Sequence, residues 1–129
     1  MKWIKVFAVF VLLHIVAWAG AHWVKSSNPD RVLLVADTSF AMKPHFPQMR
    51  EWIDQYASNA RYTNIVVGTD KAFIGELSEL KSTDALFRVS FGRSSAESLV
   101  PYSSEAADEK ILLSDGTFDP PDWTLVKFD

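Results

Sequence analysis

The longest hydrophobic pattern in the chain is an uninterrupted apolar stretch close to its N-terminus. Residues 6–24 carry no formal charge, and Lys5 and Lys25 flank them. As an α-helix this stretch would span roughly 28 Å, at about 1.5 Å per residue, which is close to the hydrocarbon thickness of a bilayer. The pattern predicts a transmembrane signal-anchor helix over residues 1–25, in contact with the lipid bilayer through residues 3–24.

A cleaved signal peptide is the alternative interpretation of this segment. Ala19, Gly20 and Ala21 supply the small side chains of a cleavage site, which would release the chain after Ala21. The apolar stretch continues through Trp23 and Val24, however, and this favours an uncleaved anchor.

The basic residues before the apolar stretch predict its orientation. Lys2 and Lys5 should stay in the cytoplasm, so the remainder of the chain would lie outside it. In a bacterium this describes a single-pass inner-membrane protein with a periplasmic C-terminal domain. His14 lies within the apolar stretch, where an ionisable group is a candidate functional residue. A neutral imidazole that bonds within the helix or to a neighbouring subunit is the simpler interpretation.

Beyond a polar linker at residues 26–30, strand and helix patterns alternate. Residues 31–37 begin with a continuous apolar run, which is typical of a strand buried on both faces of a parallel sheet. From Pro47 to Ala60, apolar residues recur at three- and four-residue steps, as in an amphipathic helix. Further strands are expected at residues 64–67, 72–77, 111–114 and 123–128. The alternation predicts an α/β domain over residues 31–129, with a mainly parallel, Rossmann-like sheet and flanking helices.

The pattern between residues 81 and 96 allows two interpretations. Residues 81–87 suit a helical turn capped by Ser82 or Thr83, whereas apolar and polar residues alternate over 86–91 as in a strand. A loop at residues 92–95 and a helix from Ala96 would follow.

Composition restricts the function. The 129 residues leave room for one small domain after the apolar stretch. The chain has 16 Asp and Glu residues against 13 Lys and Arg, and two of the basic residues precede the apolar stretch. The domain is therefore acidic, and no basic surface for nucleic acid is expected. The chain has no cysteine, which excludes disulfides, thiolate catalysis and cysteine-ligated metals. No pattern for a small-molecule substrate is evident.

Candidate chemistry follows two of the expected strands. Asp37, Thr38 and Ser39 come at the end of the first, and Asp115 follows the strand at 111–114. Because ligands of open α/β sheets bind at the carboxyl ends of the strands, Asp37 and Asp115 should emerge at a shared rim. Simpler roles for these residues are caps of the following turns through their side-chain oxygens.

An enzyme is not expected. No G-x-S-x-G motif surrounds Ser39 or Ser114 as a nucleophile, and apart from His14 within the membrane segment only the membrane-proximal His22 and His45 offer an imidazole. A surface-loop histidine is a simpler role for His45 than a position at the rim.

Residues 31–129 resemble a von Willebrand factor A (VWA) domain. The resemblance rests on the segment DTSFA at 37–41, the helix from Pro47 and the segment ILLSDG at 111–116. FGRSSA at 91–96 occupies the place of the family's threonine-bearing loop. The family holds a divalent cation in a metal-ion-dependent adhesion site, through an Asp, two Ser, a Thr and a late Asp.

Carried over, the resemblance implies Mg²⁺ or another divalent cation held by Asp37, Ser39 and Asp115, with Ser94 or Ser95 in place of the threonine. Ala41 departs from the family pattern because it lacks the second serine hydroxyl. The implied function is a membrane-anchored protein–protein interaction or assembly module. The alternative is a structural accessory subunit of an energy-converting or transport complex, with a vestigial metal site.

The domain is also short for this family, so one edge of its sheet is expected to lack a cover. An exposed edge pairs readily with other chains unless it is charged or covered. The expected partners are therefore other subunits of a membrane complex.

Overall fold

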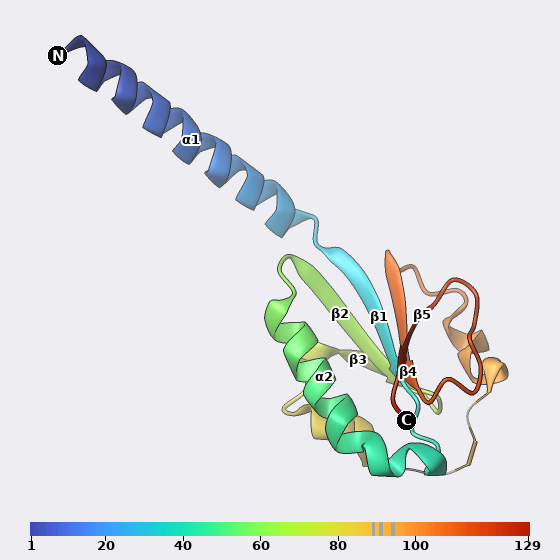
Figure 1. The fold of residues 1–129 in the computed structure, drawn as a ribbon. Coiled ribbons are helices and arrows are strands. Elements are labelled where there is room, and N and C mark those ends of the chain that lie inside the picture. Colours follow the sequence, from blue (N-terminus) through green and yellow to red (C-terminus); the bar gives the residue numbers. More distant parts are fainter. Residues whose placement is uncertain (89, 91, 94) are drawn as a thin grey trace.

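The structure is a computed structural model that describes residues 1–129 except 89, 91 and 94. It consists of a long N-terminal helix and a separate α/β domain (Figure 1). The helices and strands are α1 (Lys2–Ser27), β1 (Asp30–Ala36), α2 (Phe46–Asn59), β2 (Thr63–Thr69), β3 (Phe73–Glu76), β4 (Glu109–Ser114) and β5 (Thr124–Lys127). Four 3₁₀ helices join them: η1 (Phe40–His45), η2 (Leu77–Glu79), η3 (Thr83–Phe87) and η4 (Ala96–Tyr102).

α1 is long and apolar enough to cross a membrane, and none of its residues is buried against the domain. A signal sequence near an N-terminus meets the same criterion. The helix continues through Ser27, so Ser26 and Ser27 belong to it and not to the predicted linker. Only Asn28 and Pro29 separate α1 from β1.

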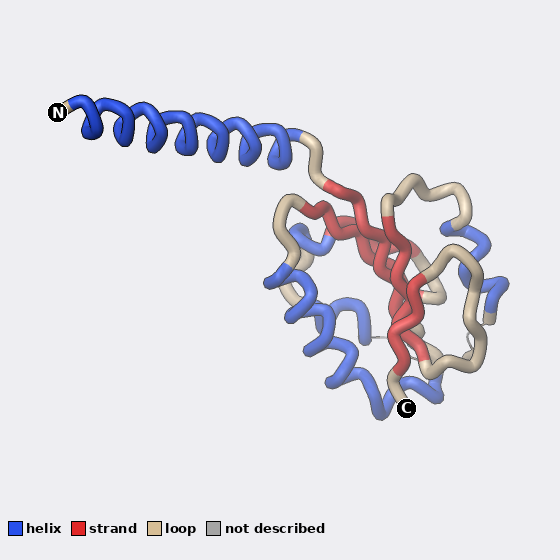
Figure 2. Tube along the Cα trace, turned by 45° about the horizontal axis from the view of Figure 1, so that its top comes forward, coloured by secondary structure: helices blue, strands red, loops and turns tan. Residues whose placement is uncertain are grey.

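The five strands form one mixed sheet in the order β3-β2-β1-β4-β5. β1 pairs in parallel with β2 and β4, and β5 pairs in parallel with β4. β3 alone among these strands is antiparallel. The prediction of an α/β fold with a mainly parallel sheet is confirmed. Figure 2 shows α2 on one side of the sheet, with η4 and loops on the other.

β1 lies at the centre of the sheet, which explains its continuous apolar sequence. Val32, Leu34 and Ala36 pack on the α2 face, where Met49 and Ile53 of α2 are fully buried. α2 extends from Phe46 to Asn59 and confirms the predicted amphipathic helix.

The opposite face of the sheet is covered by short segments. Leu33 and Val35 of β1 pack there with Leu99 and Tyr102 of η4 and with the partly buried Trp123. The predicted helix from Ala96 is a 3₁₀ helix. Pro101 lies inside it and has no N–H to donate to an α-helical hydrogen bond.

The segment at 83–87 is helical, so the helical-turn interpretation holds for it. Ser82 caps η3 by accepting a hydrogen bond from the backbone N–H of Asp84 at 3.2 Å, and Thr83 Oγ1 donates to Asp54 Oδ1 of α2 at 3.0 Å. These contacts and the burial of Leu86 against α2 favour the helix over the alternating strand. Val89 and Phe91 of that strand interpretation lie outside the described residues.

The register brings the ends of the central strands to one edge. Ala36 of β1 is paired with Thr69 of β2 and with Leu113 of β4. Asp37 then donates its backbone N–H to the carbonyl of Leu113 at 2.9 Å, and Asp70 donates its own to the carbonyl of Ala36 at 3.2 Å. The carboxyl ends of β1, β2 and β4 therefore lie together.

Candidate functional site

A cavity opens at this carboxyl edge of the sheet and is called the rim cavity below. It has a volume of about 390 Å³. Its lining residues are Asp37, Ser39, Phe40, Ala41, Gly92, Arg93, Asp115 and Thr117. Asp37, Ser39 and Asp115, predicted from separate parts of the sequence, thus line one cavity.

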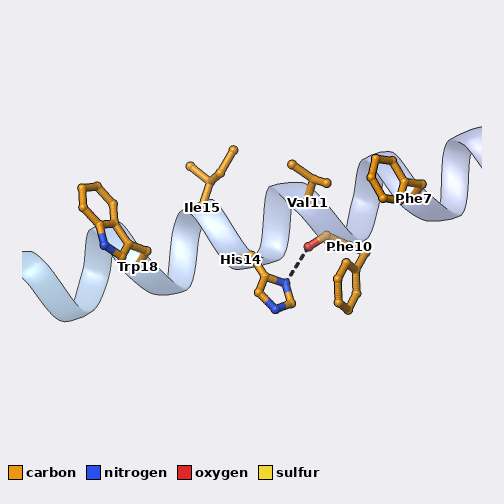
Figure 3. A pocket seen from close by; sticks show the side chains of 6 residues that line it. All are labelled: Phe7, Phe10, Val11, His14, Ile15 and Trp18. Atoms are coloured by element: carbon orange, nitrogen blue, oxygen red, sulfur yellow. Dashed lines mark hydrogen bonds between the residues drawn. The ribbon is translucent and has the colours of Figure 1, made fainter.

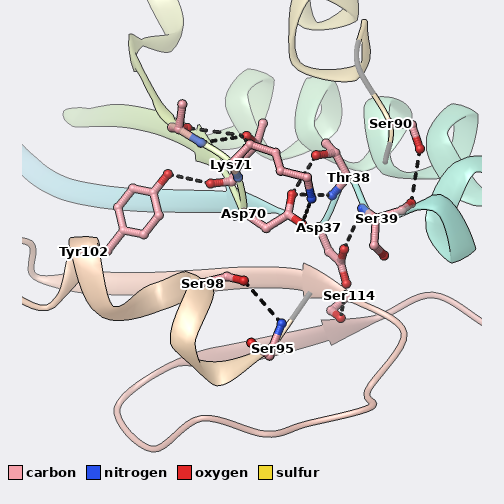
Figure 4. A network of polar contacts seen from close by, with 12 residues as sticks. Asp37, Thr38, Ser39, Asp70, Lys71, Ser90, Ser95, Ser98, Tyr102 and Ser114 are labelled. Atoms are coloured by element: carbon pink, nitrogen blue, oxygen red, sulfur yellow. Dashed lines mark hydrogen bonds and ion pairs between the residues drawn. The ribbon is translucent and has the colours of Figure 1, made fainter. Parts of the chain in front are cut away.

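Asp37 is a buried carboxylate with neutral hydrogen-bond donors. Only 3% of the residue is exposed. Its Oδ1 accepts the backbone N–H of Ser39 at 2.9 Å, and its Oδ2 accepts the hydroxyl of Ser114 at 2.9 Å (Figure 4). Burial of an ionised carboxylate is costly unless hydrogen bonds or an opposite charge compensate it. Here the protein supplies the hydrogen bonds.

Asp115 lies at the edge of the same cavity and is partly exposed. The hydroxyl of Thr117 donates to its Oδ1, as does the backbone N–H of Thr117 at 3.0 Å. These bonds, the hydroxyl's first, lower the pKa of Asp115, so its side chain carries a negative charge at neutral pH. Ser114 Oγ also lies 3.4 Å from Asp115 Oδ1, and this fully buried hydroxyl therefore stands between the two carboxylates.

Ser39 adds a neutral oxygen to this arrangement. The residue is 5% exposed and lines the cavity. Its backbone N–H donates to Asp37 Oδ1, and its carbonyl accepts a hydrogen bond from the hydroxyl of Ser90 at 3.3 Å. Within the described part of the chain, the hydroxyl of Ser39 has no hydrogen-bond partner, which leaves it available to a ligand.

The cavity lining holds two carboxylates and one basic side chain. None of the ion pairs among the described residues includes Asp37 or Asp115. Arg93 is the one basic residue in the lining. Two carboxylates and a serine hydroxyl form a donor set that suits a hard cation such as Mg²⁺, which prefers oxygen ligands and retains water. The methyl group of Ala41 lines the cavity without adding a donor.

The two other predicted ligands are not brought to this cavity by the described structure. Ser95 is the N-cap of η4, where it exchanges hydrogen bonds with Ser98, including Ser95 N–H to Ser98 Oγ at 3.3 Å. It does not line the rim cavity. Ser94 lies outside the described residues. Gly92 and Arg93 do reach the site: both line the cavity, and Phe40 donates its N–H to the carbonyl of Gly92 at 3.2 Å.

A second polar cluster, which the sequence pattern alone does not predict, joins the loops after β1 and β2. Thr38 donates its N–H and its hydroxyl to Asp70 Oδ1, at 2.9 Å and 2.6 Å. Lys71 Nζ forms an ion pair with Asp70 Oδ2. The available signal was the position of Asp70, which follows an apolar strand just as Asp37 does. Both hydrogen-bond donors of Thr38, its N–H and its hydroxyl, are therefore occupied by Asp70.

Tyr102 of η4 holds the end of β2 from the other face. Its hydroxyl donates to the carbonyl of Thr69 at 2.6 Å, and the residue is 3% exposed. Burial, together with the nearby charge of Asp70, raises the pKa of the phenol to about 12.

No protein-family description, curated protein or solved structure matches this chain. The interpretation of the rim cavity therefore depends on its own residues. In the described part of the chain, no three His, Cys, Asp or Glu side chains form a group able to hold a metal. A cation at Asp37 and Asp115 would accordingly take ligands from serine and water as well.

Proposed function

We propose that this protein is a non-catalytic, membrane-anchored interaction module of the VWA type. In this proposal α1 is an uncleaved anchor and the rim cavity binds a divalent cation and a partner protein. The observation that carries the proposal is the convergence of Asp37, Ser39 and Asp115 on one cavity at the carboxyl edge of the sheet.

The arrangement of the chain supports binding away from the membrane. α1 joins the amino end of β1 (Figure 1). The rim cavity lies beyond the carboxyl end of this strand. The seven residues of β1 extend about 23 Å at about 3.3 Å each. A cavity at that distance from the anchor would be open to another protein on the same side of the membrane.

The side chains at the mouth of the cavity support a protein partner. Phe40 is 68% exposed although it is large and apolar. Exposed aromatic side chains next to polar groups are enriched in protein interfaces. A partner that places a carboxylate on the cation and an apolar side chain on Phe40 would use both features.

A structural accessory subunit with a vestigial cation site is the second candidate. Ala41 provides no oxygen to the cavity, and both carboxylate oxygens of Asp37 already accept hydrogen bonds from the protein. Arg93, in the same lining, offers a positive charge without a metal. In this case α1 and the sheet edges would make the contacts to other subunits.

A cation titration separates the two candidates. MgCl₂ or MnCl₂ is added to the full chain in detergent micelles at constant ionic strength, and the melting temperature of the domain is followed. For the cation-dependent module we expect a stabilisation above about 1 kcal/mol at saturating metal, because a ligand that binds only the folded state stabilises it.

Two variants make this titration specific. Asp37→Asn keeps the shape of the side chain and should abolish the stabilisation, whereas Asp119→Asn, at an exposed position outside the cavity, should retain it. Equal shifts in both variants, or none in the wild type, would contradict a cation site and leave the accessory-subunit candidate.

A further inference from the structure

One face of α1 carries a shallow groove with a single polar side chain. The groove has a volume of about 420 Å³ and is lined by Phe7, Phe10, Val11, His14, Ile15 and Trp18 (Figure 3). These residues recur at three- and four-residue steps and therefore share one side of the helix. Aliphatic residues such as Leu12 and Val16 occupy the opposite side.

The hydrogen bond of His14 determines which of its nitrogens carries a proton. His14 Nδ1 lies 2.9 Å from the carbonyl oxygen of Phe10, and the two rings are 4.2 Å apart between centroids. Since a carbonyl only accepts, Nδ1 must carry the hydrogen. A neutral imidazole has one N–H, so Nε2 is left as an acceptor. Among the described residues no donor reaches it.

An unpaired acceptor at this depth cannot easily be satisfied by solvent. His14 is near the middle of α1, roughly 18 Å from either end at about 1.5 Å per residue. An imidazole side chain is too short to reach the interface over that distance. Polar groups in the hydrocarbon region are therefore paired with groups on neighbouring helices.

We infer that the groove around His14 is the docking site for a transmembrane helix of a different subunit, which donates a hydrogen bond to His14 Nε2 from a Ser, Thr, Asn or Gln side chain. A second copy of this chain with its His14 facing this one does not meet the requirement. Two facing neutral imidazoles that each keep the bond to Phe10 both offer acceptors, and a donor would need that bond to break or one ring to take up a second proton. This inference rests on the proposed membrane placement of α1 but not on the cation site.

The inference is tested in phosphatidylcholine vesicles with two synthetic leucine-rich transmembrane peptides of about 20 residues. One peptide has a central asparagine and the other a central leucine. The full chain is labelled through Lys2→Cys, which is selective because the chain has no cysteine of its own, and association is measured by energy transfer to a dye on the peptide. Resistance to alkaline extraction confirms that the chain has inserted.

We expect the asparagine peptide to bind the wild-type chain roughly 3-fold or more tightly than the leucine peptide, in the range of interhelical hydrogen bonds. His14→Phe, which keeps a ring but removes the acceptor, should abolish that preference. Leu12→Phe, on the opposite side of the helix, should leave it unchanged.

Two outcomes would overturn the inference while leaving the membrane anchor intact. One is an equal preference for asparagine in His14→Phe and wild type. The other is energy transfer between copies of the chain that His14→Phe removes, which would make a second copy the occupant. A chain that fails to insert would overturn both this inference and the proposed anchor, whereas the cation titration reports on the rim cavity independently.

Discussion

At the scale of single residues, the carboxylates at the sheet edge differ in what balances their charge. Asp70 is paired with Lys71 and accepts two hydrogen bonds from Thr38, so its charge is used within the fold. Asp37 and Asp115 have only neutral donors among the described ion pairs and hydrogen bonds. Negative charge without a fixed cation favours a cationic ligand. The rim cavity is thus the more suitable of the two clusters for binding.

Tyr102 should make the stability of the domain sensitive to alkaline pH. Its pKa is about 12 in the folded chain because the phenol is buried, against about 10 in an unfolded chain. Below about pH 10 the phenol is protonated in both states and the full stability is present. As pH rises toward 12 the unfolded state loses its proton first, so the free energy of unfolding should fall by about 2 kcal/mol.

Urea denaturation of the full chain in micelles, at pH 8 and pH 11, measures this effect. Tyr102→Phe should cost about 1 kcal/mol at pH 8, because it removes the hydrogen bond to the carbonyl of Thr69, and should lose less stability than the wild type on going to pH 11. A constant difference between the two proteins at both pH values would show that the phenol does not titrate as its burial implies.

The positions of site residues could be predicted from the sequence where they follow from the order and direction of the strands. They could not be predicted where a side chain bonds to its own neighbouring segment instead. Asp37, Ser39 and Asp115 were predicted because the carboxyl ends of parallel strands meet at one edge. Ser95, one of two alternatives for the family's threonine, instead caps η4, because a serine before a helix can satisfy the helix N-terminus. The bond from the hydroxyl of Ser114 to Asp37 cannot be predicted from the sequence, because the two residues lie at the ends of different strands and the direction of a side chain depends on the folded sheet.

At the scale of elements, the two faces of the sheet have unequal covers. α2 provides a continuous layer on one face, whereas η4 and the segment around Trp123 cover the other. Contact between η4 and β2 depends on a glycine: a Cβ at Gly68 would collide with Tyr102, with its Cε1 and Cζ at 3.0 Å and its hydroxyl closer still. Gly68 therefore permits η4 to approach the strand.

Gly68→Ala should push η4 away from β2, because the added methyl group would collide with Tyr102. We expect a loss of about 1–3 kcal/mol in the free energy of unfolding, as is usual when an added methyl group overpacks a core. Gly20→Ala is a matched control, since nothing lies within 4 Å of a Cβ at that position. Combining Gly68→Ala with Tyr102→Phe removes the nearest colliding atom, so the double variant should lose less than the sum of the single losses.

Elements were predictable where one pattern dominates and ambiguous where two fit. β1 and α2 have long patterns of a single period, and both formed where expected. Residues 81–91 carried both a capping signal and an alternating pattern, and η3 formed over 83–87 through contacts with α2 that are distant in sequence. The antiparallel direction of β3 follows from its short connection to β2, because parallel strands need a longer crossover.

At the scale of the whole molecule, α1 and the rim cavity lie at opposite ends of β1. Because α1 meets the amino end of this strand, every parallel strand of the sheet directs its carboxyl end away from α1. Both sheet edges, β3 and β5, are four-residue strands, and short edge strands limit unspecific pairing. Binding by the domain is therefore best served by its loops at the distal end.

The proposed topology predicts where single cysteines can be labelled. The chain has none of its own, so Phe40→Cys at the exposed mouth of the cavity and Lys2→Cys at the N-terminus are each unique. The variants are expressed in a bacterial host, and spheroplasts are treated with a membrane-impermeant maleimide. Phe40→Cys should be labelled before lysis and Lys2→Cys only after lysis, since the basic N-terminus stays inside. The opposite order would reverse the orientation. Loss of the Lys2→Cys signal from a shortened chain would instead establish cleavage and exclude the anchor.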